Sequence, residues 1–122
     1  DDPILKGEWL KPGAHVNAIG CVNPMGREVD TEAVAKSRLF FDQAEAAKKS
    51  GDIAIPLGRG EITEDGFIGD IGSVLAGDLP GRTSAKDITM FKSVGISAVD
   101  VAAALVIFEK AAAQGLGIEV EI

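Results

Sequence analysis

The fold of this chain is decided by one stretch, Asp87–Ala111, which reads DITMFKSVGISAVDVAAALVIFEKA. Residues 88–92 carry the two-residue alternation of a β-strand. The Lys92–Gly95 segment breaks this alternation, and Gly95 has the backbone freedom that a sharp turn requires. Every residue from 101 to 108 is apolar, which predicts a helix that is buried on all sides. The stretch therefore predicts a strand, a tight turn and the longest helix of the chain.

The two ends of the predicted helix carry capping signals. Ser97 is placed to be the N-cap, and Asp100 stands three residues later, where the acidic partner of a capping box belongs. Gly115 suits the position after the C-cap, and Leu116 can fold back onto the last turn. The apolar run rises only about 12 Å, which is too short to cross a bilayer. We therefore expect this helix to lie in a protein interior.

Composition and charge limit the class of protein. The 122 residues amount to one domain or less, and a hydrophobic fraction of 46% is sufficient for a core. The formal net charge of -7 argues against nucleic acid and against anionic membrane surfaces as partners. A single cysteine, Cys21, and a single histidine, His15, exclude an internal disulfide and argue against any metal site of zinc or iron. No signal peptide or membrane span is visible, so the expected location is cytoplasmic.

The first half of the chain alternates between strand and helix signals. The pattern predicts a strand over 14–19 that ends at Gly20, a helix over 32–37 capped by Asp30 or Thr31, a strand over 38–42 and a helix over 43–50. Short connections between such elements imply parallel strands with right-handed crossovers. We therefore expect an α/β fold built on a parallel sheet.

The second half gives weaker signals. Residues 56–66 are interpreted as irregular, and residues 67–76 have apolar positions near helical spacing that end at Gly77. Residues 78–81 predict a turn, and the alternation over 117–122 predicts a terminal strand. These predictions complete an order of strand, helix, strand, helix and then strand and long helix.

Two glycine-rich segments are poor candidates for phosphate binding. Gly58–Gly60 lacks the third glycine of a dinucleotide loop, because Thr63 occupies that place. Gly77–Thr83 is one residue shorter than a phosphate loop, and Arg82 replaces its lysine. Ordinary turn chemistry explains both segments.

Four residues in or after the first predicted strand are candidate site residues. His15 lies on the strand, where a packed or hydrogen-bonded role is commoner than a catalytic one. Cys21 lies just past the strand end, where open α/β sheets bind ligands, yet no basic neighbour in sequence would lower its thiol pKa. Arg27 and Glu28 fit a surface ion pair as well as they fit a pair that orients a ligand.

The Lys92–Gly95 turn is the stronger candidate. Its backbone N–H groups and the Ser93 hydroxyl lie at a strand-to-helix turn, which is a natural contact for an anion or an amide. An ordinary helix N-terminus fits the spacing equally well. The buried helix expected behind the turn would hold such a site rigidly, which favours the functional interpretation.

Several segments, taken together and in order, are similar to a known family. They are Glu8–Gly20 (EWLKPGAHVNAIG), Pro24 with Arg27–Asp30, Phe40–Asp42, Ser50–Asp52, Ile68–Gly72 with Ala76 and Gly77, Pro80–Arg82, and Phe91–Gly95 with Val99, Asp100 and Ala103. With this set the chain resembles the ornithine cyclodeaminase/mu-crystallin family over nearly its whole length.

The resemblance implies the C-terminal part of a two-domain, NAD(P)-dependent protein. Its fold would be the C-terminal portion of a Rossmann-like, doubly wound parallel sheet. Residues 1–122 would form a partial nucleotide-binding domain, with residues 115–122 as a candidate return to the substrate and dimerisation domain. The start at Asp1 without an initiator methionine fits a longer protein, and the dinucleotide loop and basic substrate ligands would lie upstream.

The resemblance also implies site residues. The expected contacts of NAD or NADP are Val16, Asn17, Ala18 and Ser93, and the expected substrate contacts are Lys92 and Val94. Members that cyclise ornithine carry a catalytic aspartate where this chain has Val22, which cannot act as a general acid or base. No catalytic residue is therefore assigned in this chain.

This departure speaks against ornithine cyclodeaminase proper and favours an amino acid dehydrogenase or an imine or ketimine reductase. The function that the resemblance implies is therefore an oxidoreductase of a small amino or imino acid, a class in which we also keep a cyclodeaminase-like enzyme. The alternative is a non-catalytic, mu-crystallin-like binding protein. We expect a homodimer, and little or no activity from these residues alone. Half of a Rossmann sheet leaves an open strand edge, which invites association with a second copy or with the missing half.

Overall fold

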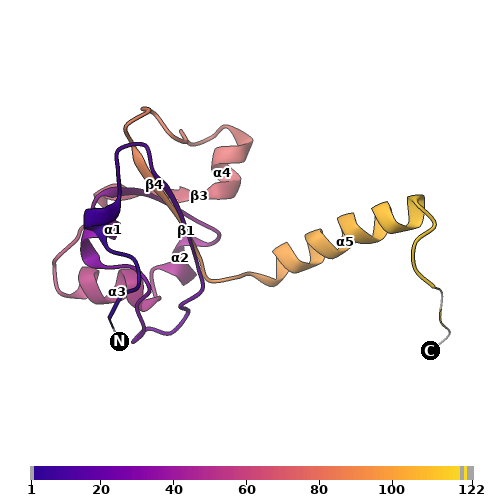
Figure 1. Cartoon of the computed structure of the whole chain (residues 1–122), viewed down its shortest axis with the longest axis horizontal. Coiled ribbons are helices and arrows are strands. Elements are labelled where there is room, and N and C mark those ends of the chain that lie inside the picture. Colours follow the sequence, from indigo (N-terminus) through magenta and orange to yellow (C-terminus); the bar gives the residue numbers. More distant parts are fainter. Residues whose placement is uncertain (1, 119, 121–122) are drawn as a thin grey trace.

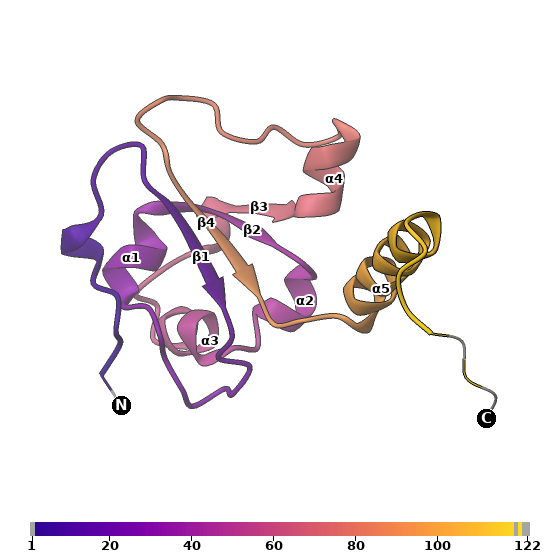
Figure 2. The ribbon, with the colours of Figure 1, turned by 45° about the vertical axis from the view of Figure 1, so that its right-hand side comes forward.

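The computed structural model describes residues 2–118 and 120, and four parallel strands within them form one sheet. The strands are β1 (His15–Ile19), β2 (Ser37–Phe41), β3 (Phe67–Asp70) and β4 (Ile88–Ser93). Their order in the sheet is β1-β4-β2-β3, so the last strand in sequence lies between the first two (Figure 2). The expected α/β fold with a parallel sheet is confirmed.

Three short helices cover one face of the sheet. They are α1 (Thr31–Ala35), α2 (Ala44–Ala47) and α3 (Gly51–Gly58), gathered on the same side of the strands in Figure 2. The core lies between them and the sheet, and its members include Leu39, Phe41 and Met90 from the strands and Val34 and Ile53 from the helices. On the opposite face of β1, His15 and Asn17 are exposed, as the alternation of that strand predicts.

The predicted elements of the first half are largely present. Asp30 is the N-cap of α1, where its Oδ1 accepts from the Ala33 N–H at 2.7 Å. The helix predicted over 43–50 is shorter than expected, because α2 ends at Ala47 and α3 begins at Gly51. Helix α3 includes residues 56–58, which are predicted to be irregular. Pro56 lies inside this helix and a glycine lies at each end, and these residue types are unusual in a helix.

The helix predicted over 67–76 is wrong in its first part. Residues 67–70 form β3, and only Ile71–Ala76 form a helix, α4. Gly69 has a φ of +138°, far from helical values, and it pairs with Phe40 of β2. Gly77 ends α4 in the left-handed conformation, as predicted.

Helix α5 (Ser97–Ala113) has the predicted extent but not the predicted burial. It projects from the end of β4, clear of the sheet (Figure 1), and all its residues are exposed except the half-buried Ala111. Phe108, for example, is 70% exposed. Gly95, with a φ of +80°, turns the chain, and the extended backbone of Ile96 then leads into the helix. The apolar composition of α5 predicts that this helix needs a covering surface. Among the described residues, no other element covers it.

Only the C-terminal end of α5 agrees with the predicted capping. The N-cap is Ile96, which has no capping side chain, so Ser97 is the first helical residue instead of the cap. At the C-terminal end Gly115 has a φ of +65°, and the Leu116 N–H donates to Ala111 O at 2.9 Å. This is the predicted fold-back of the last turn.

Two further findings concern the end of the chain and membranes. The strand predicted over 117–122 includes residues 119, 121 and 122, which lie outside the described residues, and the described residues of that range are in no strand. Among residues 2–118 and 120, no helix is both long enough and apolar enough to span a membrane.

Candidate functional site

The ends of β1 and β4 lie side by side at one rim of the sheet. The parallel pairing places Ala18 beside Lys92 and Ile19 beside Ser93. Immediately past the strand, the Gly20 N–H donates to Ser93 O at 3.3 Å. The two segments implied by the resemblance therefore meet at the carboxyl ends of parallel strands, the edge at which open α/β sheets bind ligands.

The turn after β4 is fixed by a carboxylate that follows β2. Asp42 Oδ2 accepts from Ser93 Oγ at 2.7 Å, from the Val94 N–H at 3.0 Å and from the Gly95 N–H at 2.8 Å. Its other oxygen accepts from the Gln43 N–H at 2.8 Å. The donors that were candidates for an external anion are thus already bound to Asp42.

Asp42 is ionised at neutral pH. Partial burial raises the pKa of its carboxyl group, but hydrogen bonds from the Ser93 hydroxyl and from the N–H groups of Gln43, Gly95 and Val94 lower it, and the net pKa lies below the ordinary value. A carboxylate at this place holds the turn in one conformation through charge-assisted hydrogen bonds.

Two hollows lie along this rim, and Ile19 lines both. One, of about 320 Å³, is lined by Ser93 and Asp42 and by the first turn of α5. The other, of about 220 Å³, runs beside β1 and is lined by Val16, Asn17 and Ala18. The implied cofactor contacts therefore border open space, with the side chain of Asn17 exposed and that of Ala18 buried on the core face.

The implied substrate contacts face the interior. Lys92 is completely buried, with its Nζ 2.9 Å from Asp52 Oδ2. Val94 is half-buried and packs against the hydrophobic core. Neither residue is among those that line the two hollows, and the role of Lys92 and Val94 as substrate contacts stays a prediction.

The loop between β1 and α1 holds the positions that the sequence singled out past the strand end. Val22 is 63% exposed. Cys21 has a φ of +45°, and partial burial raises the pKa of its thiol, with the negative charge of Asp52 acting in the same direction. A raised thiol pKa agrees with the expectation that Cys21 is not a nucleophile. Arg27 Nη2 donates to Thr31 Oγ1 at 3.2 Å, a local contact.

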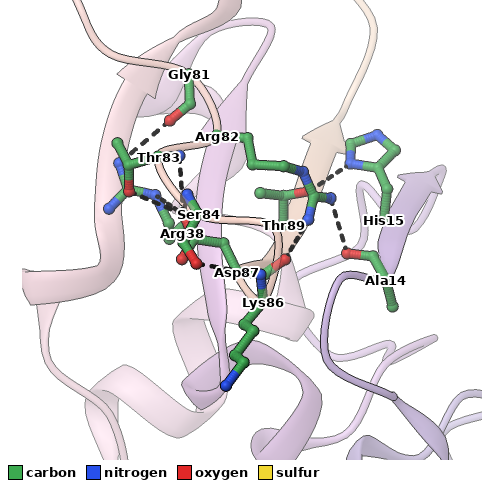
Figure 3. A network of polar contacts seen from close by, with 10 residues as sticks. All are labelled: Ala14, His15, Arg38, Gly81, Arg82, Thr83, Ser84, Lys86, Asp87 and Thr89. Atoms are coloured by element: carbon green, nitrogen blue, oxygen red, sulfur yellow. Dashed lines mark hydrogen bonds and ion pairs between the residues drawn. The ribbon is translucent and has the colours of Figure 1, made fainter.

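A second polar network lies at the other end of the strands (Figure 3). His15 Nδ1 lies 2.8 Å from Thr89 Oγ1, so the hydrogen-bonded interpretation of His15 is confirmed. Arg82 Nη2 donates to the same hydroxyl at 2.8 Å and to Ala14 O at 3.2 Å. Asp87 Oδ2 accepts from the Thr83 N–H and the Ser84 N–H. These contacts fold the loop between α4 and β4, and they account for Arg82 without a phosphate.

Sequence reasoning missed two carboxylates at the rim, Asp42 and Asp52. Each belongs to a segment quoted for the family resemblance, but neither was assigned a role. Asp42 follows an apolar strand directly, which is a position at the carboxyl edge of the sheet and could have signalled it. Asp52 lies in the first turn of a helix, where acids are common for other reasons, so the sequence carries no distinctive signal for it.

The parallel sheet, the helices on its core-forming face and the rim at the strand ends define a Rossmann-like α/β domain. The profile of the ornithine cyclodeaminase/mu-crystallin family matches residues 1–115. The chain belongs to this family.

Individual relatives extend the comparison. An alanine dehydrogenase of Archaeoglobus fulgidus is 37% identical over 119 residues, which cover 98% of this chain and 37% of the relative. Ketimine reductase mu-crystallin of Mus musculus is 37% identical over 109 residues, which cover 88% and 32%. The chain thus spans about a third of the length of these relatives.

The fold agrees with that of a solved family structure. A Thermococcus litoralis Δ1-pyrroline-2-carboxylate reductase, solved with NADH and L-proline, superposes with a TM-score of 0.85 at 39% identity. The match covers 97% of this chain and 37% of that protein.

Proposed function

We propose that this chain is the C-terminal part of the nucleotide-binding domain of an NAD(P)-dependent oxidoreductase that acts on a small amino or imino acid. The observation that carries the proposal is the meeting of β1 and the Ser93 turn at one rim, beside two hollows that share Ile19. The relatives support it, because they are an alanine dehydrogenase and imine or ketimine reductases.

The residues at the rim fit a nicotinamide. Asn17 exposes an amide side chain beside the hollow of β1, and its Oδ1 lies 3.2 Å from His15 Nε2, which leaves its NH2 group free to donate to a carboxamide oxygen. Val16, Ala18 and Ser93 would complete this side of the site. The bound cofactor supplies hydride transfer, and these residues bind and orient it.

Ser93 provides the direct test. In a longer protein that supplies the implied dinucleotide loop, the Ser93→Leu variant places a branched apolar side chain at the rim, and we expect NADH and NADPH affinity to fall about tenfold or more. Nicotinamide fluorescence on titration with protein measures this affinity, and circular dichroism checks that the variant is folded. Ser84→Leu, at an exposed position in the loop before β4, is the matched control. A folded Ser93→Leu variant with unchanged affinity contradicts the proposal.

A second candidate function is a ligand-binding protein without turnover. The observation in its favour is Val22, an apolar and exposed side chain at the position of the family aspartate. Turnover of NADH with a set of amino and imino acids separates the candidates. We expect none from residues 1–122 alone, because the implied basic substrate ligands are not among them, and the decisive assay uses a protein that supplies them.

The proposal includes a homodimer in the cytoplasm. The exposed apolar surface of α5 supports self-association, as does the outer edge of β1, which pairs with no further strand among the described residues. A related archaeal alanine dehydrogenase was solved as a dimer with NAD. The single cysteine agrees with a reducing compartment.

A further inference from the structure

One buried ion pair holds both ends of the loop at residues 21–27. Lys92 Nζ lies 2.9 Å from Asp52 Oδ2, and both side chains are 0% exposed. The same ammonium group donates to Gly20 O at 2.6 Å, immediately before the loop. Asp52 Oδ1 accepts from the Glu28 N–H at 2.7 Å and from the Val29 N–H at 3.0 Å, immediately after it.

The middle of the loop rests on the same helix start. The Gly51 N–H donates to Asn23 O at 3.1 Å. A Cβ atom at Gly51 would lie only 2.1 Å from Gly26 O, so the loop backbone packs directly on the first turn of α3. Three segments that are distant in sequence, namely β4, α3 and the loop, are therefore joined through Lys92 and Asp52.

We propose that Lys92 and Asp52 are positioning residues for the loop at 21–27, which borders the cofactor rim. The inference rests on the proposed function, because the loop leaves the rim at Gly20, beside Ser93. Taking two charges out of water costs several kcal/mol, and apolar residues of similar size are often as stabilising. Unlike an apolar pair, this ion pair makes directional contacts, because it fixes three backbone groups at the loop ends.

The reaction rate of the Cys21 thiol can report whether this loop opens. Cys21 is the only cysteine in the chain, it lies inside the loop, and its side chain is half-buried. In reaction with an aromatic disulfide reagent, the Cys21 thiolate forms a mixed disulfide and releases the coloured aromatic thiolate. The rate depends on access to the thiol, so it rises when the loop opens.

The double variant Lys92→Met/Asp52→Leu carries the mutational test. Either single change leaves an unpaired buried charge and is expected to be strongly destabilising, whereas the double change keeps an apolar core. We expect the double variant to fold, with Cys21 reacting about tenfold faster or more because the loop is no longer held. Val34→Ala, a core truncation in α1, is the control and should leave the rate unchanged. A folded double variant with the original Cys21 rate overturns the proposal.

A second measurement uses the unaltered protein and does not depend on any variant. The N–H groups of Glu28 and Val29 should exchange with deuterium as slowly as those of β4, because they are bound to a buried carboxylate. Exchange at the rate of an exposed loop overturns the proposal.

Cofactor binding separates this inference from the proposed function. Neither Cys21 reactivity nor hydrogen exchange requires a cofactor, so both test the positioning role even if NADH does not bind. If the unaltered protein binds NADH, the double variant should bind it about tenfold more weakly while Val34→Ala binds normally. These affinities are measured in a longer protein that supplies the implied dinucleotide loop. Equal NADH affinity in that unaltered protein and in its folded double variant contradicts the positioning role, whereas no binding by the unaltered longer protein contradicts only the proposed function.

Discussion

The hydroxyl of Ser93 lies 2.7 Å from Oδ2 of Asp42, and this hydrogen bond joins the end of β4 to the end of β2. Because the same oxygen accepts two backbone N–H groups, the Asp42→Ala variant should lower the free energy of unfolding by about 1–2 kcal/mol. Urea denaturation followed by circular dichroism measures the change. Asp78→Ala, at an exposed loop position, is the control and should change stability by less than about 0.5 kcal/mol. Equal midpoints for the two variants would mean that Asp42 does not stabilise the turn.

Stability should fall in acid through two carboxyl groups. Despite partial burial, which raises it, the hydrogen bonds to Asp42 lower its net pKa, and the N–H and hydroxyl of Thr83 lower the pKa of Asp87, so both pKa values lie below the ordinary aspartate value in the folded protein. A depressed carboxyl pKa contributes stability that is present above the unfolded pKa and is lost as pH falls through the folded pKa. The Tm should therefore be steady above about pH 5 and should fall below about pH 4.

The variants that test this fall of Tm in acid, called the acid limb, are Asp42→Asn and Asp87→Asn. Each should flatten the dependence of Tm on pH, because the asparagine cannot titrate. Tm is measured by circular dichroism over the acidic range. An acid limb that is equally steep in the double Asn variant would assign the pH dependence to other groups.

Two glycines should respond in opposite directions to the same substitution. Gly51→Ala places a methyl group against Gly26 O and should cost about 1–3 kcal/mol, because neither backbone segment can move freely. Gly72→Ala lies within α4 with no atom near the new Cβ and should stabilise by about 0.5–1 kcal/mol. Chemical denaturation of both variants checks the prediction, and a neutral Gly51→Ala would contradict the close packing of loop and helix.

Arg82 should control the mobility of the loop before β4. Its guanidinium group joins Ala14 O, Asp87 O and Thr89 Oγ1, so Arg82→Met releases three acceptors at once (Figure 3). We expect faster cleavage after Lys86 by a lysine-specific protease, which reports local opening. Arg59→Met, at an exposed position with a long ion pair, should leave that cleavage rate unchanged. Equal rates in all three proteins would show that Arg82 does not hold the loop.

The exposed surface of α5 should drive self-association. Leu105 and Phe108 lie one turn apart on the helix, and Leu105→Gln/Phe108→Gln should raise the dimer dissociation constant about tenfold or more. Sedimentation velocity over a range of protein concentrations measures it. Glu109→Gln is the control on the same helix, and an unchanged constant for the double variant would place the interface elsewhere.

Sequence patterns predicted those elements whose signals are local. The alternation around Val16 and Met90 is a direct consequence of strands with one buried face, and both strands are where it indicates. The left-handed glycines at Gly77 and Gly115 end their helices as predicted. The family resemblance then related these elements to a rim at which Ser93 and β1 meet.

The missed features depend on contacts between distant residues. The apolar spacing of β3 fits a helix as well as a strand, and only the pairing of Gly69 with Phe40 distinguishes the two. Helix α3 contains Pro56 and starts at a glycine that packs on Gly26. Asp42 is hydrogen-bonded to residues more than 50 positions away, as far as Gly95, so its place after β2 could indicate the rim, but no window of sequence could reveal these partners.

The open position of α5 also affects how unfolding can be monitored. An environment-sensitive dye that fluoresces on apolar surfaces would already bind the native chain, so its signal would not report the transition. Trp9 is 59% exposed in the folded state and would give only a small change in intrinsic emission. Far-ultraviolet ellipticity is the signal to use, because it reports the backbone structure of the helices and strands and depends neither on a dye nor on the surroundings of Trp9.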